Sequence, residues 1–159
     1  MARKKLDLIS VGGLGGPYDV AWRVFITAHA VVIEQIEREL AEGGLPPLGW
    51  YDVLLELSVA PGRRLRMHEL ARAVVLSRSG LTRLVDRLEK AGLLRREPDL
   101  ADRRGSFAVL TDEGAVMRER MWPVYARGIA KHFGQHLDDE EARVLTRVLK
   151  RVLDAAREA

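Results

Sequence analysis

Apolar residues recur at every third or fourth position over two stretches near the start of the chain, which predicts two helices. The first covers 17–42, opens with Pro17 and stops at Gly43-Gly44; its apolar positions are Val24, Ala28, Val31, Val32 and Ile36. The second covers about 48–59, and its apolar positions are Tyr51, Val53, Leu54 and Leu57. Residues 1–16 end in GGLGG and are predicted to form a flexible arm.

The central stretch predicts two more helices joined by a break. A short extended piece at 65–66 leads into a two-turn helix over about 67–74, with Leu70, Ala71 and Val74 facing inward. After a break at Val75-Leu76, Ser77 is a favourable N-cap for a helix over about 77–91 that closes at Gly92. The apolar residues of that helix fall at i, i+3, i+4 and i+7, and they are Leu81, Leu84, Val85 and Leu88.

The last third of the chain predicts a β-hairpin followed by two helices. Two short apolar segments, 93–97 and 107–110, flank the charged loop DLADRRGS at 99–106. Thr111 caps the next helix, and its stripe at every fourth residue comprises Met117, Met121, Tyr125, Ile129 and Phe133. Pro123 predicts a kink or a restart there. A capping box of Asp138 and Glu141 opens a helix over about 139–156, which is expected to bury Leu145, Val148, Leu149 and Val152.

Charge is distributed unevenly along this pattern. Residues 61–110 hold twelve Lys and Arg against six Asp and Glu, a net charge of +6, whereas the remaining residues hold fourteen against seventeen. Eleven of the twelve basic residues are arginines, the side chain favoured for bidentate contacts with phosphates and bases. A basic block between neutral-to-acidic flanks indicates a polyanionic partner.

Two helices joined by a break and followed by a hairpin predict a winged helix-turn-helix. The fold class is therefore mainly α with a small β-hairpin wing, flanked by N- and C-terminal helices. A helix about 10–12 Å wide fits the major groove of B-DNA. The outward residues of the second helix are the candidate DNA contacts, and they are Ser77, Arg78, Ser79, Thr82, Arg83 and Arg87. A merely solvated polar face is the alternative, but helix, hairpin and basic block agree on DNA.

The loop DLADRRGS is the predicted tip of the wing. Arg103 and Arg104 are expected to reach a narrow minor groove, where the negative potential is enhanced. Asp99 and Asp102 are expected to shape the loop through Asx turns or by pairing with these arginines. Gly105 is expected to supply a positive φ for the return into the second strand.

The stretch LARAVVLSRSGLTRLVDRLEKAGLLRREPDLADRRGSFAVLTDEG resembles the core of the multiple-antibiotic-resistance regulator (MarR) family, and the likeness extends over about 17–156. The shared features are LA…LS.S.LTR.VDRLE..GL..R, the wing DLADRRG and the closing LT..G. The resemblance implies a sequence-specific DNA-binding transcriptional regulator, a repressor that binds a pseudo-palindromic double-stranded operator. It also implies that a small effector of aromatic or phenolic type weakens DNA binding.

The resemblance divides the chain into the arm and a single domain over 17–159. The winged helix-turn-helix occupies about 46–111, and dimerisation helices occupy about 17–42 and 112–157. A homodimer is also expected because three amphipathic helices carry more apolar surface than one small winged-helix unit covers. Such a dimer sets two recognition helices about 34 Å apart, one turn of DNA.

The family's ligand sites lie in a cleft between the dimer helices and the winged helix. The resemblance places six candidate effector-binding residues there, namely Trp22, Arg23, His29, Trp50, Asp52 and Trp122. Trp22 and Asp52 match the tryptophan and aspartate of a urate-sensing branch. Packing of the tryptophans, and a place for Asp52 in the first turn of its helix, are the alternatives.

Asp86 lies on the predicted recognition helix and has two sets of candidate partners. In the resembled family an acid at this place pairs with a wing arginine, which here is Arg103 or Arg104. Pairing with Arg83 or Lys90 on its own helix is the alternative.

Other functions find little support in the sequence. Without cysteine, disulfides and thiol switches are excluded, and no nucleophile–base pair or cofactor motif indicates an enzyme. His132 and His136 have the i, i+4 spacing of a metal pair, but a plain polar helix face is expected and no metal is assigned. No apolar run approaches a membrane span, so a cytoplasmic protein without a membrane partner is expected. A winged-helix protein-interaction module without a DNA-binding role is the alternative function.

Overall fold

The computed structural model describes residues 16–74, 78–102 and 105–158. Its elements in chain order are α1 (Pro17–Glu42), α2 (Leu48–Val59), the 3-10 turn η1 (Pro61–Arg63), β1 (Arg64–Arg66), α3 (Met67–Ala73), α4 (Arg78–Lys90), β2 (Leu94–Pro98), β3 (Ser106–Leu110), α5 (Asp112–His132), the 3-10 turn η2 (Gly134–His136) and α6 (Asp139–Glu158). The predicted class, mainly helical with a small β wing, is confirmed.

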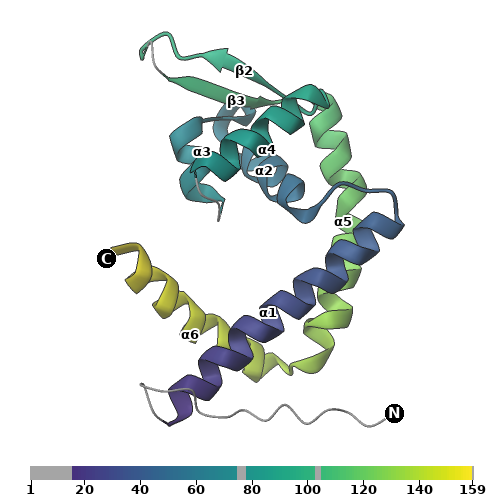
Figure 1. Cartoon of the computed structure of the whole chain (residues 1–159), viewed down its shortest axis with the longest axis vertical. Coiled ribbons are helices and arrows are strands. Elements are labelled where there is room, and N and C mark those ends of the chain that lie inside the picture. Colours follow the sequence, from purple (N-terminus) through teal and green to yellow (C-terminus); the bar gives the residue numbers. More distant parts are fainter. Residues whose placement is uncertain (1–15, 75–77, 103–104, 159) are drawn as a thin grey trace.

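The winged helix-turn-helix lies at one end of the molecule, and the long helices lie at the other (Figure 1). Helices α2, α3 and α4 pack beside the sheet, and α5 leads away from it alongside α1. The antiparallel sheet has the order β1-β3-β2, so the short extended piece predicted at 65–66 is part of a third strand, β1, on the far side of β3. In this register Arg66 lies opposite Phe107, and Glu97 lies opposite Phe107 from the other side.

The predicted helix ends are confirmed where the structure describes them. Gly92 adopts φ 75° after α4, a left-handed conformation in which glycine avoids the steric cost of a Cβ. The hydroxyl of Thr111 accepts a hydrogen bond from the Gly114 amide at 3.1 Å and so caps α5. Asp138 and Glu141 exchange both bonds of a capping box, at 2.8 and 2.9 Å. The proposed cap Ser77 lies outside the described residues.

Two apolar clusters hold the fold together. The first joins the buried faces of α2, α3 and α4 to the sheet, and its fully buried members include Leu54, Leu57, Leu70, Val85, Leu88 and Leu94. The second joins α1, α2 and α5 through Ile36, Leu40, Leu48, Tyr51 and Met121. Because α5 contributes to both clusters, it connects the winged helix to α1.

Three local expectations are wrong, and for Pro123 one of the two alternatives, the restart, is excluded. Gly105 has no positive φ; space is instead tight there, since a Cβ would lie 3.3 Å from the Asp102 carbonyl oxygen. Asp52 lies beyond the first turn of α2. Pro123 does not restart the helix, because α5 continues through it. His132 and His136 do not share a helix face, because Phe133, at φ −133°, ends α5 between them.

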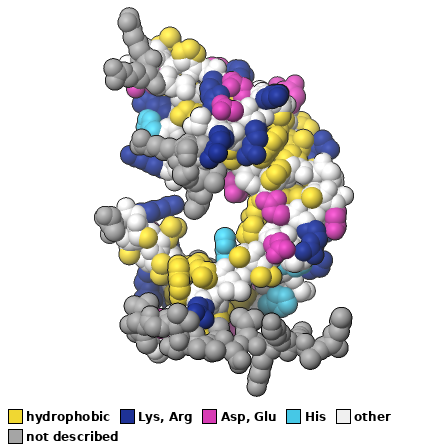
Figure 2. Space-filling view, in the orientation of Figure 1, with side chains coloured by type: hydrophobic (Ala, Val, Ile, Leu, Met, Phe, Trp, Pro, Cys, Tyr) yellow, Lys and Arg dark blue, Asp and Glu magenta, His cyan; other side chains and the backbone are white. Residues whose placement is uncertain are grey.

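The outer helices bury less than the sequence predicts. Val148 and Val152 on α6 are 37% and 60% exposed in the protomer, whereas Leu145 and Leu149 line an apolar groove against α1. Leu145 and Leu149 remain partly exposed in that groove, so none of the four α6 residues is buried within a single chain and the expected burial is wrong for the protomer. Hydrophobic side chains gather on the surface where α6 meets α1 (Figure 2).

Candidate nucleic-acid interface

Helix α4 has one face in the core and one in solvent. Leu81, Leu84, Val85 and Leu88 are at most 4% exposed, so the packing sets the rotation of the helix about its axis. Thr82, Arg83 and Arg87 are exposed on the other side, as expected from the sequence. The side chains of Arg78 and Ser79 lie outside the described part. The structure thus places a cationic helix face on a rigid support, and Lys and Arg are prominent over this end of the molecule (Figure 2).

Arg96 on β2 joins the wing to α4. Its guanidinium contacts Asp86 Oδ1 and Glu89 Oε2, both at 2.6 Å, while its backbone amide donates to Glu89 Oε1 at 2.9 Å. Partial burial disfavours the charge of Arg96, but hydrogen bonds to the two carboxylates outweigh this and raise its pKa. Among the described residues, Asp86 therefore pairs with an arginine of the hairpin strand β2, and the alternative pairing with Arg83 or Lys90 on its own helix is wrong.

Asp86 points from α4 toward the root of the hairpin, where β2 runs past the helix, and a strand side chain reaches it there. Arg103 and Arg104, the other expected partners, lie outside the described residues. The sequence signal that was available is the adjacent pair Arg95-Arg96, whose second member points to the helix side of the hairpin.

The wing loop is shaped by Asp99, as expected. Its Oδ1 accepts a hydrogen bond from the Ala101 amide at 3.0 Å, which is the Asx-type contact predicted. Its Oδ2 lies 2.8 Å from Arg66 Nε on β1, so its described cationic partner comes from the neighbouring strand. Sequence reasoning missed Arg66 because only the strand pairing brings it to the loop.

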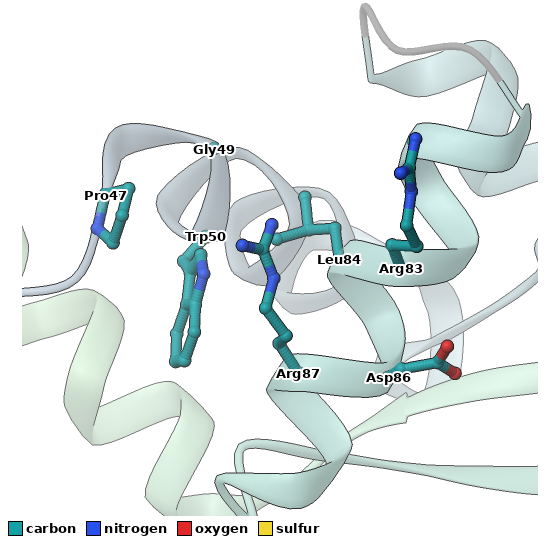
Figure 3. Close-up of a pocket in the computed structure, with 8 residues that line it drawn as sticks. Pro47, Gly49, Trp50, Arg83, Leu84, Asp86 and Arg87 are labelled. Carbon is teal, nitrogen blue, oxygen red and sulfur yellow. The ribbon is translucent and has the colours of Figure 1, made fainter.

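An open pocket of about 680 Å³ lies between α2 and α4. Figure 3 shows Arg87 turned toward Trp50, with Asp86 pointing away from the indole. Pro47, Leu84 and Trp50 supply apolar walls, and Arg83 and Arg87 supply positive charge. Asp86 also lines the pocket, but its carboxylate is paired with Arg96. This combination suits a flat, anionic, partly apolar molecule.

The six candidate effector residues do not share one pocket in the protomer. Three of them lie on the first half of α1, namely Trp22, Arg23 and His29. There the ring of Trp22 packs against that of Phe25, with 6.1 Å between the two ring centres. Trp122 stacks with Tyr51 at 6.1 Å, also between ring centres, on the side of α2 that faces α5. Trp50 alone of the six lines the pocket beside α4.

Asp52 lies close to this aromatic cluster and to other acids. Burial by neighbouring groups, followed by the charges of Glu56 and Glu37, raises the pKa of Asp52. Burial, followed by the charges of Asp52 and Tyr51, also raises the pKa of Tyr125. Asp52 nevertheless stays solvent-accessible in the protomer, so its electrostatic effect is modest.

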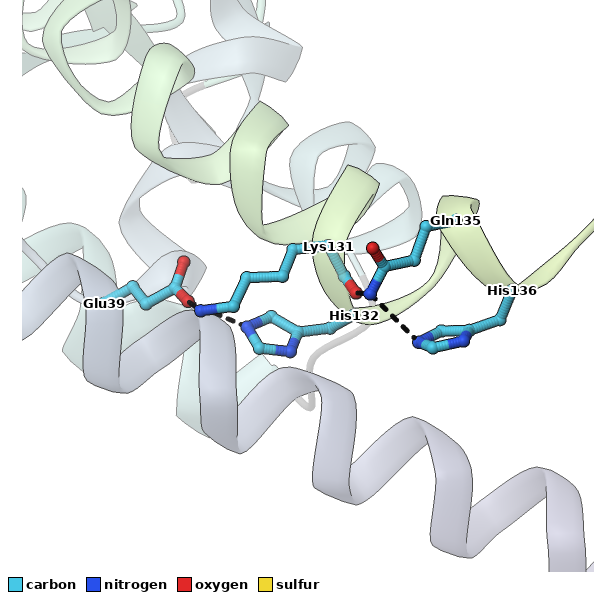
Figure 4. Close-up of polar contacts among 5 residues, drawn as sticks. All are labelled: Glu39, Lys131, His132, Gln135 and His136. Carbon is cyan, nitrogen blue, oxygen red and sulfur yellow. Dashed lines mark hydrogen bonds and ion pairs between the residues drawn. The ribbon is translucent and has the colours of Figure 1, made fainter.

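A polar cluster between α1 and α5 was not anticipated from the sequence (Figure 4). Glu39 Oε1 lies 2.8 Å from both Lys131 Nζ and His132 Nε2. Hydrogen bonds from Lys131 and then His132 lower the pKa of Glu39, although burial opposes them. The described part of the chain contains no group of three or more metal-ligating side chains, at this cluster or elsewhere. No helix among the described residues is long and apolar enough to cross a membrane.

The recognition helix, the hairpin and the basic face together define a winged helix-turn-helix DNA-binding protein. The model of the MarR family matches residues 43–105. The helix-turn-helix-type transcriptional regulator YkoM of Bacillus subtilis (strain 168) is 30% identical over 129 residues, which is 81% of this chain and 82% of that protein. The chain belongs to the MarR family and is a DNA-binding transcriptional regulator, not an enzyme.

Solved structures agree with this assignment. AbsC, a MarR family transcriptional regulator from Streptomyces coelicolor, superposes with a TM-score of 0.83 at 33% identity, covering 94% of this chain and 100% of that one. Sco3205, a MarR family regulator from the same organism solved in complex with DNA, gives 0.81 at 34% identity, covering 86% and 89%. The predicted family and fold are therefore confirmed.

Proposed function

We propose that the chain is a homodimeric repressor that binds a pseudo-palindromic operator and is released by a small aromatic acid. The observation that carries the proposal is the outer face of α4, where Thr82, Arg83 and Arg87 are exposed opposite a fully packed face. Arginine reads guanine O6 and N7 bidentately in the major groove, and threonine is short enough to allow close approach. The similar regulator Sco3205 was solved in complex with DNA, which supports DNA binding by this chain.

We divide the proposed DNA contacts between α4 and the wing. We assign base edges and nearby phosphates to α4 and its start, through Ser77, Arg78, Ser79, Thr82, Arg83 and Arg87. Arg103 and Arg104 at the wing are assigned to the minor groove, where narrow stretches attract arginine. Phosphate contacts give affinity that falls with salt, whereas contacts to base edges give sequence preference.

The apolar groove between α1 and α6 supports a homodimer. It has a volume of about 570 Å³, and its lining is apolar except for His29. Nearby, Tyr18 and Trp22 are 74% and 58% exposed, and Val152 on α6 is 60% exposed. A soluble monomer rarely leaves so much contiguous apolar surface in water, and a second copy packed on these helices covers it.

The pocket beside α4 supports an anionic aromatic effector. A planar ring packs on Trp50, and a carboxylate on that ring pairs with Arg87, which is turned toward the indole. Such a ligand would pair with an arginine side chain of α4 that otherwise contacts a phosphate or a base. Release of DNA then follows from direct competition for Arg87 together with Arg83, which lines the same pocket.

Fluorescence anisotropy with a labelled pool of random-sequence duplex tests the DNA-binding part. We expect affinity to fall about 10³-fold between 50 and 200 mM salt if some six phosphates are contacted. Arg83→Ala should weaken binding, whereas the control Arg38→Ala should not, because Arg38 on α1 makes only an exposed ion pair with Glu34 at 3.4 Å. Equal effects of the two variants, or affinity insensitive to salt, contradict the assignment of α4.

Tryptophan fluorescence tests the effector part. Salicylate, benzoate and urate are titrated into the wild type and Trp50→Phe, with benzyl alcohol as the uncharged control. We expect an acid to quench the wild type and to displace DNA, and Trp50→Phe to lose the quenching. Quenching that survives in Trp50→Phe but disappears in Trp22→Phe contradicts the pocket beside α4 and places the effector site at the first half of α1.

A further inference from the structure

We infer that Arg66 is a positioning residue for the wing, holding the buried carboxylate of Asp99 and thereby fixing the wing loop against the first turn of α3. The inference rests on the proposed function for its effect on DNA, but it concerns a contact within the protein. Arg66 lies on β1, outside the recognition helix and the wing tip. It is not among the residues that we assign to DNA contact.

Asp99 is the only buried charged residue in the described part of the chain, with 6% of its surface exposed. Its Oδ2 lies 2.8 Å from Arg66 Nε, and its Oδ1 accepts from the Ala101 amide at 3.0 Å. The Nε–H is not aligned with Oδ2 for a hydrogen bond, so the contact is an ion pair. A buried carboxylate without its cation is strongly unfavourable, and Arg66 is therefore required for this loop conformation.

The backbone of Asp99 holds both ends of the wing loop. Its amide donates to the Gly105 carbonyl at 3.1 Å, and its carbonyl accepts from the Asp102 amide at 3.2 Å. Gly105 in turn donates to the Asp102 carbonyl at 2.8 Å, and a Cβ on Gly105 would lie only 3.3 Å from Asp99 Cβ. Asp99 therefore fixes the positions of Asp102 and Gly105, the described residues on either side of 103–104.

Arg66 is itself held by the helix-turn-helix. Its backbone amide donates to Glu69 Oε2 at 2.9 Å, which caps the first turn of α3. Its guanidinium lies 5.5 Å from the centre of the Phe107 ring on β3. The ion pair with Asp99 consequently links the wing loop to α3, and through the sheet to the unit that presents α4.

The neighbouring residue Arg64 provides a matched control. It lies on the same strand and the same side of the sheet, and its guanidinium is 4.7 Å from the centre of the Phe107 ring. Its acidic partner is Glu97 at 3.8 Å, which is 37% exposed rather than buried. Removal of Arg64 therefore changes charge and cation–π contact on the same strand without leaving a buried carboxylate unpaired.

The test compares Arg66→Gln, Arg66→Lys and Asp99→Asn with the control Arg64→Gln in the full chain. Amide hydrogen exchange of the free protein is measured at 99–106 and over α4. We expect Arg66→Gln to raise exchange in the wing loop at least about 10-fold while α4 stays protected, and Arg66→Lys to restore part of the protection. Arg64→Gln is expected to leave the loop unchanged. Unchanged loop exchange in Arg66→Gln, or an equal rise in Arg64→Gln, overturns the inference.

Hydroxyl-radical footprinting on bound DNA supplies the second readout. Arg66→Gln should lose minor-groove protection at the outer ends of the site while guanine protection in the major groove persists, and Asp99→Asn should do the same. The double variant Arg66→Gln with Asp99→Asn should lose no more minor-groove protection than either single variant, because each single change already removes the same ion pair. Wild-type protein that lacks minor-groove protection contradicts the proposed wing contact, and hydrogen exchange still decides the inference. Should Arg66→Gln fail to fold, the single variants Asp99→Asn and Arg66→Lys are compared with Arg64→Gln by the same two measurements.

Discussion

Gly114 in the first turn of α5 cannot accept a side chain, and Gly114→Ala should be strongly destabilising. A Cβ at this position would lie 2.0 Å from the carbonyl oxygen of Leu93 and 2.8 Å from Leu110 Cδ1. Contacts of Cβ below 3.0 Å are essentially absent from real proteins, so the backbone must move. The Leu93 carbonyl is not free to withdraw, because it accepts from the Thr111 amide at 3.3 Å.

The magnitude follows from two opposing effects. Alanine in place of glycine within a helix ordinarily stabilises by about 1 kcal/mol. Overpacking costs about 1–3 kcal/mol where side chains yield, and more where the obstacle is backbone. Displacing Leu93 also weakens its bond to Thr111 and moves the end of α4 relative to α5. We therefore expect a net loss of about 3 kcal/mol in the free energy of unfolding.

Urea unfolding at one fixed protein concentration measures this loss, since the concentration matters for a dimer. Gly49→Ala is the matched control, because Gly49 also lies in the first turn of a helix and its Cβ would meet only Leu84 Cδ2 at 3.8 Å. The control should be neutral or stabilised by up to about 1 kcal/mol. If Gly114→Ala unfolds within about 0.5 kcal/mol of the wild type, the close packing of α5 on the hairpin is wrong.

Four further predictions concern DNA binding, pH and assembly. Arg83→Ala should cost about 1–3 kcal/mol in operator binding and relax preference at one base pair, measured by competition with substituted operators. Arg96→Ala leaves the carboxylates of Asp86 and Glu89 on α4 without their cation, so DNA affinity should fall more at low salt than at high salt. The pKa of Asp52 is raised in the folded state, so ionisation of Asp52 should lower the free energy of unfolding as pH rises above about 4. Urea unfolding at several pH values should show that Asp52→Asn removes this contribution. Light scattering should find a dimer at micromolar concentration, and a monomer would contradict the proposed interface.

The buried faces of the winged-helix helices were predictable from the sequence because apolar periodicity sets which side of a helix packs against a core, whereas the apolar stripe of α6 stays partly exposed in the protomer. Leu81, Leu84, Val85 and Leu88 illustrate this, since their spacing placed α4 correctly and left Thr82 and Arg83 outward. The caps were predictable for a similar reason: Thr111, Asp138 and Gly92 act within a few residues along the chain. The order of two helices, a break and a hairpin then predicted the winged helix-turn-helix, and the family resemblance assigned the flanking helices to dimerisation.

The contacts between elements were not predictable in the same way. The partner of Asp86 depends on how β2 passes α4, and the partner of Asp99 depends on β1 joining the sheet beside β3. Gly105 was expected to provide backbone freedom, whereas the structure uses its lack of a side chain. The cluster of Glu39 likewise depends on the crossing of α1 and α5, which no local pattern encodes.

Selection of bound duplexes from a random DNA library with the purified full chain tests the central claim most directly. The account predicts enrichment of one sequence whose two halves are related by two-fold symmetry, with their centres about 34 Å or one helical turn apart. Arg83→Ala should enrich sequences with weaker preference at a matching position in both halves. Failure to enrich any sequence, or enrichment of a single unpaired half-site, contradicts a dimeric regulator that reads its operator through α4.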